Sequence, residues 1–254
     1  MPQLFDVVRE QVDVMSLGNH VDYDICPGGA VVLQARDPSP HVNCFYPLTG
    51  DFRYPPEVLR KLAGFYGSRG VDGCVFDPFR MYPERAFATI AFIHVPATCP
   101  VGHVDSDFSC ERIFDLELWS RTYGVASSAT CPDSLHDRMA AIMRFRETRL
   151  YLFKHRKEIV GAGSLVRTTG DAYLASGFSI RKDFRNGSIM SRARAVRMAT
   201  DSDVIAMTTD IRFARALVRA LGNARVLGSG GFVPISSLAA DFAGEQSAAA
   251  TASA

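Results

Sequence analysis

Three apolar segments between residues 149 and 180 constrain the fold of this chain most strongly. RLYLFKH (149–155) and EIVGAGSLVR (158–167) are separated only by Arg156 and Lys157, and a third segment (172–180) follows the short turn Thr169-Gly170-Asp171. Such short connections join neighbouring antiparallel strands, because a parallel partner needs a crossover of a dozen or more residues. We therefore predict a three-stranded antiparallel meander.

After this meander, the sequence predicts helices that alternate with a strand. Arg-Asn-Gly at 185–187 reads as a turn, the residues up to 199 as an arginine-rich helix, 203–208 as a buried strand and 211–221 as a helix. Backbone N–H groups at a helix start lack intrahelical partners and meet the positive end of the helix dipole, which favours phosphate. Asn-Gly is also ordinary turn chemistry. The turn is therefore either a phosphate cradle or a plain strand-to-helix connection.

Hydrophobic periodicity and glycine or proline punctuation predict the remaining elements. The predicted helices are 5–15, a helix that starts at Pro55-Pro56 and ends at Gly67 or Gly70, 110–123 and 133–146, and the predicted strands are 30–34, 43–46, 73–76, 88–95 and 225–235. This order predicts a mixed α+β protein. Its expected domains are an N-terminal lobe (1–102), a second domain (103–242) and a disordered tail (243–254) with little large apolar surface.

Composition excludes several classes of function. The net charge of +1 gives no long-range field that would attract nucleic acid, and the arginines are not accompanied by the stacking aromatic residues that single strands need. The longest apolar run (86–97) is far shorter than the roughly 20 residues of a membrane span. Six cysteines without a Cys-x-x-Cys pair predict free thiols and no metal site. We expect a cytoplasmic protein without a secretory signal.

The order of the elements in the second domain resembles the GCN5-related N-acetyltransferase (GNAT) fold. Lys157-Glu158-Ile159-Val160-Gly161 resembles a hairpin that this family often writes with Ile-Val-Gly, and residues 178–185 resemble the family's approach to its pyrophosphate loop. Ala214, Leu217, Leu221 and Gly222 resemble the helix that follows the acetyl-CoA site. The resemblance covers about 112–237 and implies a twisted, mostly antiparallel sheet flanked by helices. The first hundred residues resemble a smaller, degenerate copy, as in tandem members.

The resemblance also implies a function. It implies an N-acyltransferase, monomeric or homodimeric, that moves an acetyl or other acyl group from acyl-CoA to an amine of a small molecule. A backbone N–H near residues 178–180 would polarise the thioester carbonyl. The implied catalytic residues are Tyr173 and Ser176, and the implied cofactor-binding residues are Phe178, Ser179, Ile180, Arg185, Asn186, Gly187, Ser188 and Ile189.

The sequence departs from the family pattern at several positions. Ser188 and Met190 stand where the family usually has glycine and a small residue, and Val218 stands where it usually has a tyrosine. The strand before the loop lacks the usual carboxylate base at its centre. Transfer can still proceed through the proximity of amine and thioester. The alternative interpretation is a catalytically silent acyl-CoA-binding module with a regulatory or interaction role.

Overall fold

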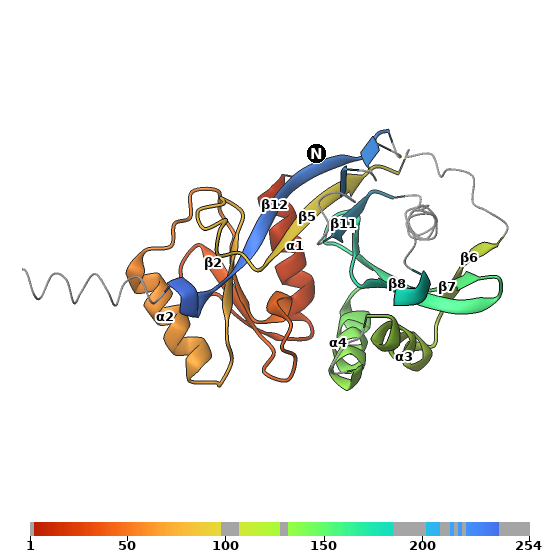
Figure 1. Ribbon diagram of the computed structural model, residues 1–254, viewed down its shortest axis with the longest axis horizontal. Coiled ribbons are helices and arrows are strands. Elements are labelled where there is room, and N and C mark those ends of the chain that lie inside the picture. The colour runs from red at the N-terminus through yellow and green to blue at the C-terminus, as the bar shows by residue number, and fades with distance from the viewer. Residues whose placement is uncertain are drawn as a thin grey trace, which may run out of the picture. The chain divides into compact units, whose positions relative to one another are not determined.

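The computed structural model describes residues 3–97, 107–127, 132–184, 202–208, 214–215, 218–219 and 222–238. Contacts divide the chain into two compact units, the first made of residues 1–90 with 229–254 and the second of residues 91–228 (Figure 1). The sequence predicts this division at 102/103 and places 229–242 in the second domain. The contacts place the division at 90/91 and assign residues from 229 onward to the first unit. The tail from 243 lies outside the described residues.

Among its described residues, the first unit contains two helices of 13 and 12 residues, a short 3-10 turn, five strands and a helical stretch at 235–238. These are α1 (Leu4–Ser16), β1 (His20–Asp22), β2 (Gly29–Leu33), η1 (Pro40–Val42), β3 (Cys44–Pro47), α2 (Pro56–Gly67), β4 (Cys74–Asp77) and the C-terminal part of β12 (Arg225–Pro234). The strand order is β1-β2-β3-β4-β12, in which only β3 and β4 run parallel. α1 and α2 lie on opposite sides of these strands (Figure 1).

Apolar side chains on one face of these strands form the core of the first unit, because successive side chains of a strand point to opposite faces. Val31, Phe45 and Val75 point to one face and pack against the buried leucines of α2, Leu59 and Leu62. Proline occupies the first turn of α2 and the helix ends at Gly67, as the sequence predicts, although the C-cap residue is Ser68 and not a glycine. The predicted helix and the predicted strands of this region are confirmed.

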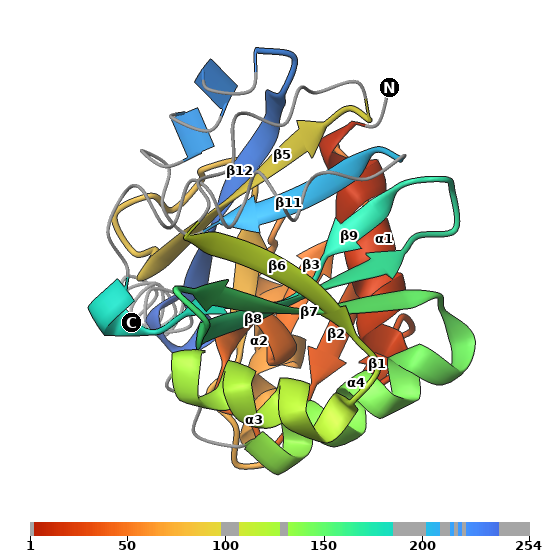
Figure 2. The same cartoon turned by 90° about the vertical axis from the view of Figure 1, so that its right-hand side faces the viewer.

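Among its described residues, the second unit contains two α-helices of 12 and 14 residues, helical residues at 214–215 and 218–219, seven strands and the start of β12. These are the last part of β5 (Ala88–Val95), β6 (Phe108–Ile113), α3 (Leu116–Ser127), α4 (Pro132–Phe145), β7 (Thr148–His155), β8 (Glu158–Arg167), β9 (Tyr173–Ala175), β10 (Phe178–Ile180), the 3-10 turn η2 (Lys182–Phe184) and β11 (Val204–Thr208). The order is β5-β11-β9-β8-β7-β6, and β10 pairs with β8. Figure 2 shows α3 and α4 against one side of β7 and β8.

Most predicted elements of the second unit are confirmed, the arginine-rich helix up to 199 lies outside the described residues, and one prediction is wrong. The meander appears as β7, β8 and the pair β9 and β10, so the α+β prediction holds. The predicted helix 110–123 is a strand up to Ile113, because β6 pairs with β7 along six residues. Its helix starts only at Leu116, where the side chain of Asp115 accepts a hydrogen bond from the amide of Leu118 at 2.8 Å.

Two further findings concern function classes. Within the described part of the chain, no helix is long and apolar enough to cross a membrane. No group of three or more His, Cys, Asp or Glu side chains in the same ranges is arranged to hold a metal ion. Cys26, Cys44, Cys74 and Cys110 are free thiols.

Candidate functional site

The central feature of the second unit is a change of pairing in the third strand of the meander. β9 runs parallel to β11 over three residue pairs, of which Ala175–Ala206 is the last. β11 continues along β5 to Thr208, whereas β10 pairs with β8. No pairing joins β10 and β11 in the described ranges. We call this divergence of residues 176–180 from 207–208 the second-unit fork.

Gly177 produces the fork through its backbone. Its φ of +78° lies in the left-handed region that glycine adopts without steric penalty. Between the pairs Val166–Leu174 and Gly163–Phe178, three steps along β8 face four steps along the other strand, which is a β-bulge. The amide of Ser164 donates to the Gly177 carbonyl at 2.9 Å and fixes the new register. The bulge turns the chain away from β11.

The register also decides where the backbone groups of β10 point. The Ser164–Gly177 bond and the bond from the Arg181 amide to the Val160 carbonyl (2.8 Å) place every second residue against β8. In an antiparallel ladder the residues between them point the other way. The amides of Phe178 and Ile180 are therefore directed away from β8, toward the side on which β11 flanks β9.

Helix α3 supports the bulge from one side. The indole nitrogen of Trp119, which is fully buried, donates to the Gly163 carbonyl at 2.8 Å. The Tyr123 ring stacks on the Trp119 indole at 5.2 Å between centroids. A Cβ at Gly177 would lie 3.2 Å from Tyr123 Cε2, so the ring fits closely against the bulge. The complete burial of Trp119 makes it a core anchor of α3.

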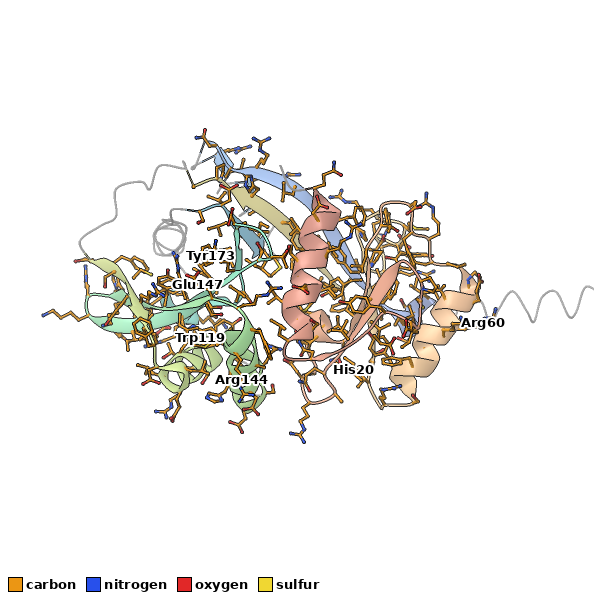
Figure 3. The ribbon with its side chains drawn as sticks, turned by 180° about the vertical axis from the view of Figure 1, so that it is seen from behind. His20, Arg60, Trp119, Arg144, Glu147 and Tyr173 are labelled. Carbon is orange, nitrogen blue, oxygen red and sulfur yellow. The ribbon has the colours of Figure 1, made fainter. Side chains whose placement is uncertain are left out.

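Tyr173, the first predicted catalytic residue, is a buried side chain with an engaged hydroxyl. The hydroxyl donates to Glu147 Oε1 at 2.7 Å (Figure 3). The guanidinium carbon of Arg149 lies 4.4 Å from the centre of the Tyr173 ring. Burial raises the pKa of Tyr173, and the hydrogen bond to Glu147 raises it further. Tyr173 is therefore protonated at neutral pH, with its hydroxyl proton directed at Glu147 Oε1.

Glu147 is the residue of this cluster that sequence reasoning missed. Its carboxylate also accepts hydrogen bonds from Arg149 Nε at 3.1 Å and from an Arg167 nitrogen at 3.3 Å. The hydrogen bond from Tyr173 is the main reason that the pKa of Glu147 lies below its ordinary value; burial opposes it, and the two arginines lower it further. The Glu147 carboxylate is ionised at neutral pH. It contacts Tyr173 of β9, a strand that has no acidic residue of its own.

The other predicted site residues are placed unequally. Ser176 is half-buried beside the bulge, and its amide donates to the Leu174 carbonyl at 2.9 Å. Ser179 is buried, and the Phe178 ring lies tilted at 44° against Phe153, with 5.0 Å between the ring centroids. Ile180 packs among Phe108, Phe153 and Val160. Arg185, Asn186, Gly187, Ser188 and Ile189, the predicted phosphate turn, lie outside the described residues.

Comparison with known proteins adds the fold to this geometry. No family model matches the sequence, and no curated protein matches it. Among solved structures, a GCN5-related N-acetyltransferase from Kribbella flavida has a TM-score of 0.64 at 10% identity, covering 91% of this chain and 94% of its own. A functionally unknown protein from Staphylococcus epidermidis has a TM-score of 0.60 at 10% identity, covering 85% and 94% respectively.

A third similar structure agrees with the first. A GCN5-related N-acetyltransferase from Sphaerobacter thermophilus has a TM-score of 0.53 at 10% identity, with 81% of this chain and 75% of that chain covered. Identities this low show a shared fold and no more. The chain therefore has the fold of the GCN5-related N-acetyltransferases.

Proposed function

We propose that this protein is an N-acyltransferase that moves an acetyl or other acyl group from acyl-CoA to an amine of a small molecule. The second-unit fork is the observation that carries the proposal. It turns the backbone amides of Phe178 and Ile180 away from β8, and amides aimed at a carbonyl oxygen stabilise the charge that develops there during acyl transfer.

The residues of the chain have distinct roles in this proposal. Acyl-CoA supplies the activated thioester. The β10 backbone orients its carbonyl, and its phosphates are expected to bind at the predicted turn 185–189, which lies outside the described residues. Tyr173 is the candidate proton donor to the leaving thiolate, with Glu147 and Arg149 fixing its ring and hydroxyl. Ser176 is the second candidate catalytic residue, and its side chain is proposed to lie beside the thioester carbonyl that the amine attacks.

Binding of acetyl-CoA tests the first step. Arg185→Glu removes a charge-assisted bond to phosphate and adds repulsion, so we expect the Kd measured by calorimetry to rise about 10- to 100-fold. Arg60→Glu makes the same charge change on the exposed surface of α2 and serves as the matched control. Equal Kd values for the two variants would mean that residue 185 does not contact the cofactor.

Turnover tests the second step. Release of free thiol from acetyl-CoA is measured over a panel of primary amines, polyamines, amino acids and amino sugars. Tyr173→Phe should lower the rate of thiol release and leave the Kd for acetyl-CoA unchanged, and Ser176→Ala is measured beside it. Binding without turnover by any amine would support the silent acyl-CoA-binding module and refute the enzyme.

Light scattering decides between monomer and homodimer, and fractionation of cells tests the cytoplasmic location.

A further inference from the structure

The first unit repeats the strand order of the second. In the first unit, β1, β2 and β3 form an antiparallel meander, β4 returns parallel to β3, and β12 flanks β4 in the antiparallel sense. In the second unit, β7, β8 and β9 form the meander, β11 returns parallel to β9, and β5 flanks β11 in the antiparallel sense. Among the described strands, each unit thus has one parallel pair, between the third strand of its meander and the strand that returns beside it.

The parallel pair of the first unit also diverges. β3 and β4 pair at Cys44–Cys74 and Phe45–Val75, and their mutual pairing stops there within the described ranges. β3 continues to residue 47 along β2, and β4 continues to residue 77 along β12. We call this divergence of residues 46–47 from 76–77 the first-unit fork.

Proline explains where the first-unit fork begins. In a parallel ladder, the residue two positions after Phe45 would donate its N–H to the Phe76 carbonyl. That residue is Pro47, which has no N–H. The hydroxyl of Tyr54 donates to the Phe76 carbonyl instead. The Tyr54 side chain, from the loop between β3 and α2, therefore takes the place of the backbone N–H that a continued ladder would supply at residue 47.

Aromatic side chains of the same loop fill the space around this hydrogen bond. Phe52 and Tyr54 are 9% and 4% exposed. The Phe52 ring lies 5.0 Å from Phe45 and 5.3 Å from Tyr54, and the Tyr54 ring lies 6.3 Å from Phe45. These rings belong to the same core cluster as the buried residues of α2. The loop is packed into the unit as part of its core.

We propose that the first unit is a second copy of the same strand arrangement whose fork is permanently occupied by its own Phe52 and Tyr54. The chain therefore holds one acyl-CoA site, in the second unit. The identity of the ligand rests on the proposed function, whereas the occupation of the first-unit fork does not.

Stoichiometry tests the number of sites. Calorimetric titration of the full chain with acetyl-CoA should give one equivalent in the wild type, and in Arg185→Glu that single equivalent should bind with a Kd about 10- to 100-fold higher. Two equivalents, or one equivalent whose Kd is unchanged in Arg185→Glu, would overturn the inference. No binding by the wild type would refute the proposed function, and the occupation of the first-unit fork is then decided by the stability measurement that follows.

The stability measurement needs no ligand. Tyr54→Phe keeps the ring and leaves the buried Phe76 carbonyl without the hydroxyl, so the Tm should fall by about 2–12 °C. Tyr23→Phe, at a residue that is 49% exposed in the same unit, is the matched control and should change the Tm by about 1 °C or less. If the two variants have the same Tm, Tyr54 does not occupy the first-unit fork and the inference is wrong.

Discussion

Replacement of Gly177 by alanine tests how the second-unit fork is built. An alanine there must adopt the left-handed backbone of the bulge, which costs an L residue about 1–2 kcal/mol. Its Cβ would also lie 3.2 Å from a carbon of the Tyr123 ring, and Trp119 stacks on that ring. We therefore expect a free-energy loss above 2 kcal/mol, and a weaker affinity for acetyl-CoA because β10 moves.

Two other glycines separate the contributions. Gly222 also has a positive φ, +64°, and a Cβ there meets nothing within 4 Å, so Gly222→Ala reports the backbone penalty alone. Gly64 lies in α2 with the same open surroundings, and Gly64→Ala should gain about 0.5–1 kcal/mol. At about 2–4 °C per kcal/mol, thermal unfolding resolves the three variants. The reasoning fails if Gly177→Ala is no less stable than Gly222→Ala, or if it binds acetyl-CoA like the wild type.

Two further predictions concern the second unit. Trp119→Phe keeps a ring but removes the donor to the buried Gly163 carbonyl, so the free energy of unfolding should fall by about 1–3 kcal/mol; an unchanged Tm would contradict this. Burial raises the pKa of Asp203, but hydrogen bonds from His94 and a backbone amide outweigh burial and lower it. The stability from this carboxylate is therefore present above the ordinary carboxyl pKa and lost as pH falls below about 4. Asp203→Asn should make stability less dependent on pH in that window, and an unchanged acid limb in urea unfolding would count against it.

The meander could be predicted from the sequence because its signals are local. Turns of two to four residues leave a strand no neighbour except the one before it, and the apolar segments at 149–155 and 158–167 meet that condition. The strand at 108–113 could not be predicted in this way. Its residues alternate weakly, and its only described neighbour, β7, lies about forty residues further along the chain.

The candidate site was predictable in its backbone and not in its side chains. A glycine within an apolar strand pattern indicates a bulge, and Gly177 is such a residue. The contact between Tyr173 and Glu147 joins residues 26 positions apart, one at the start of β9 and one just before β7. Neither residue carries a local pattern that indicates the other. Only the register of the three strands brings them together.

The assignment of β12 to the first unit has a consequence for biosynthesis. The strand that flanks β4 is made from residues 231–234, far along the chain from β4 itself, and Ile235 adds a backbone bond to Gly73. Until these residues have been synthesised, β4 has an exposed edge that attracts other strands. The N-terminal unit can therefore complete its sheet only after residue 234 has been made, and a product truncated before residue 229 would be prone to aggregate.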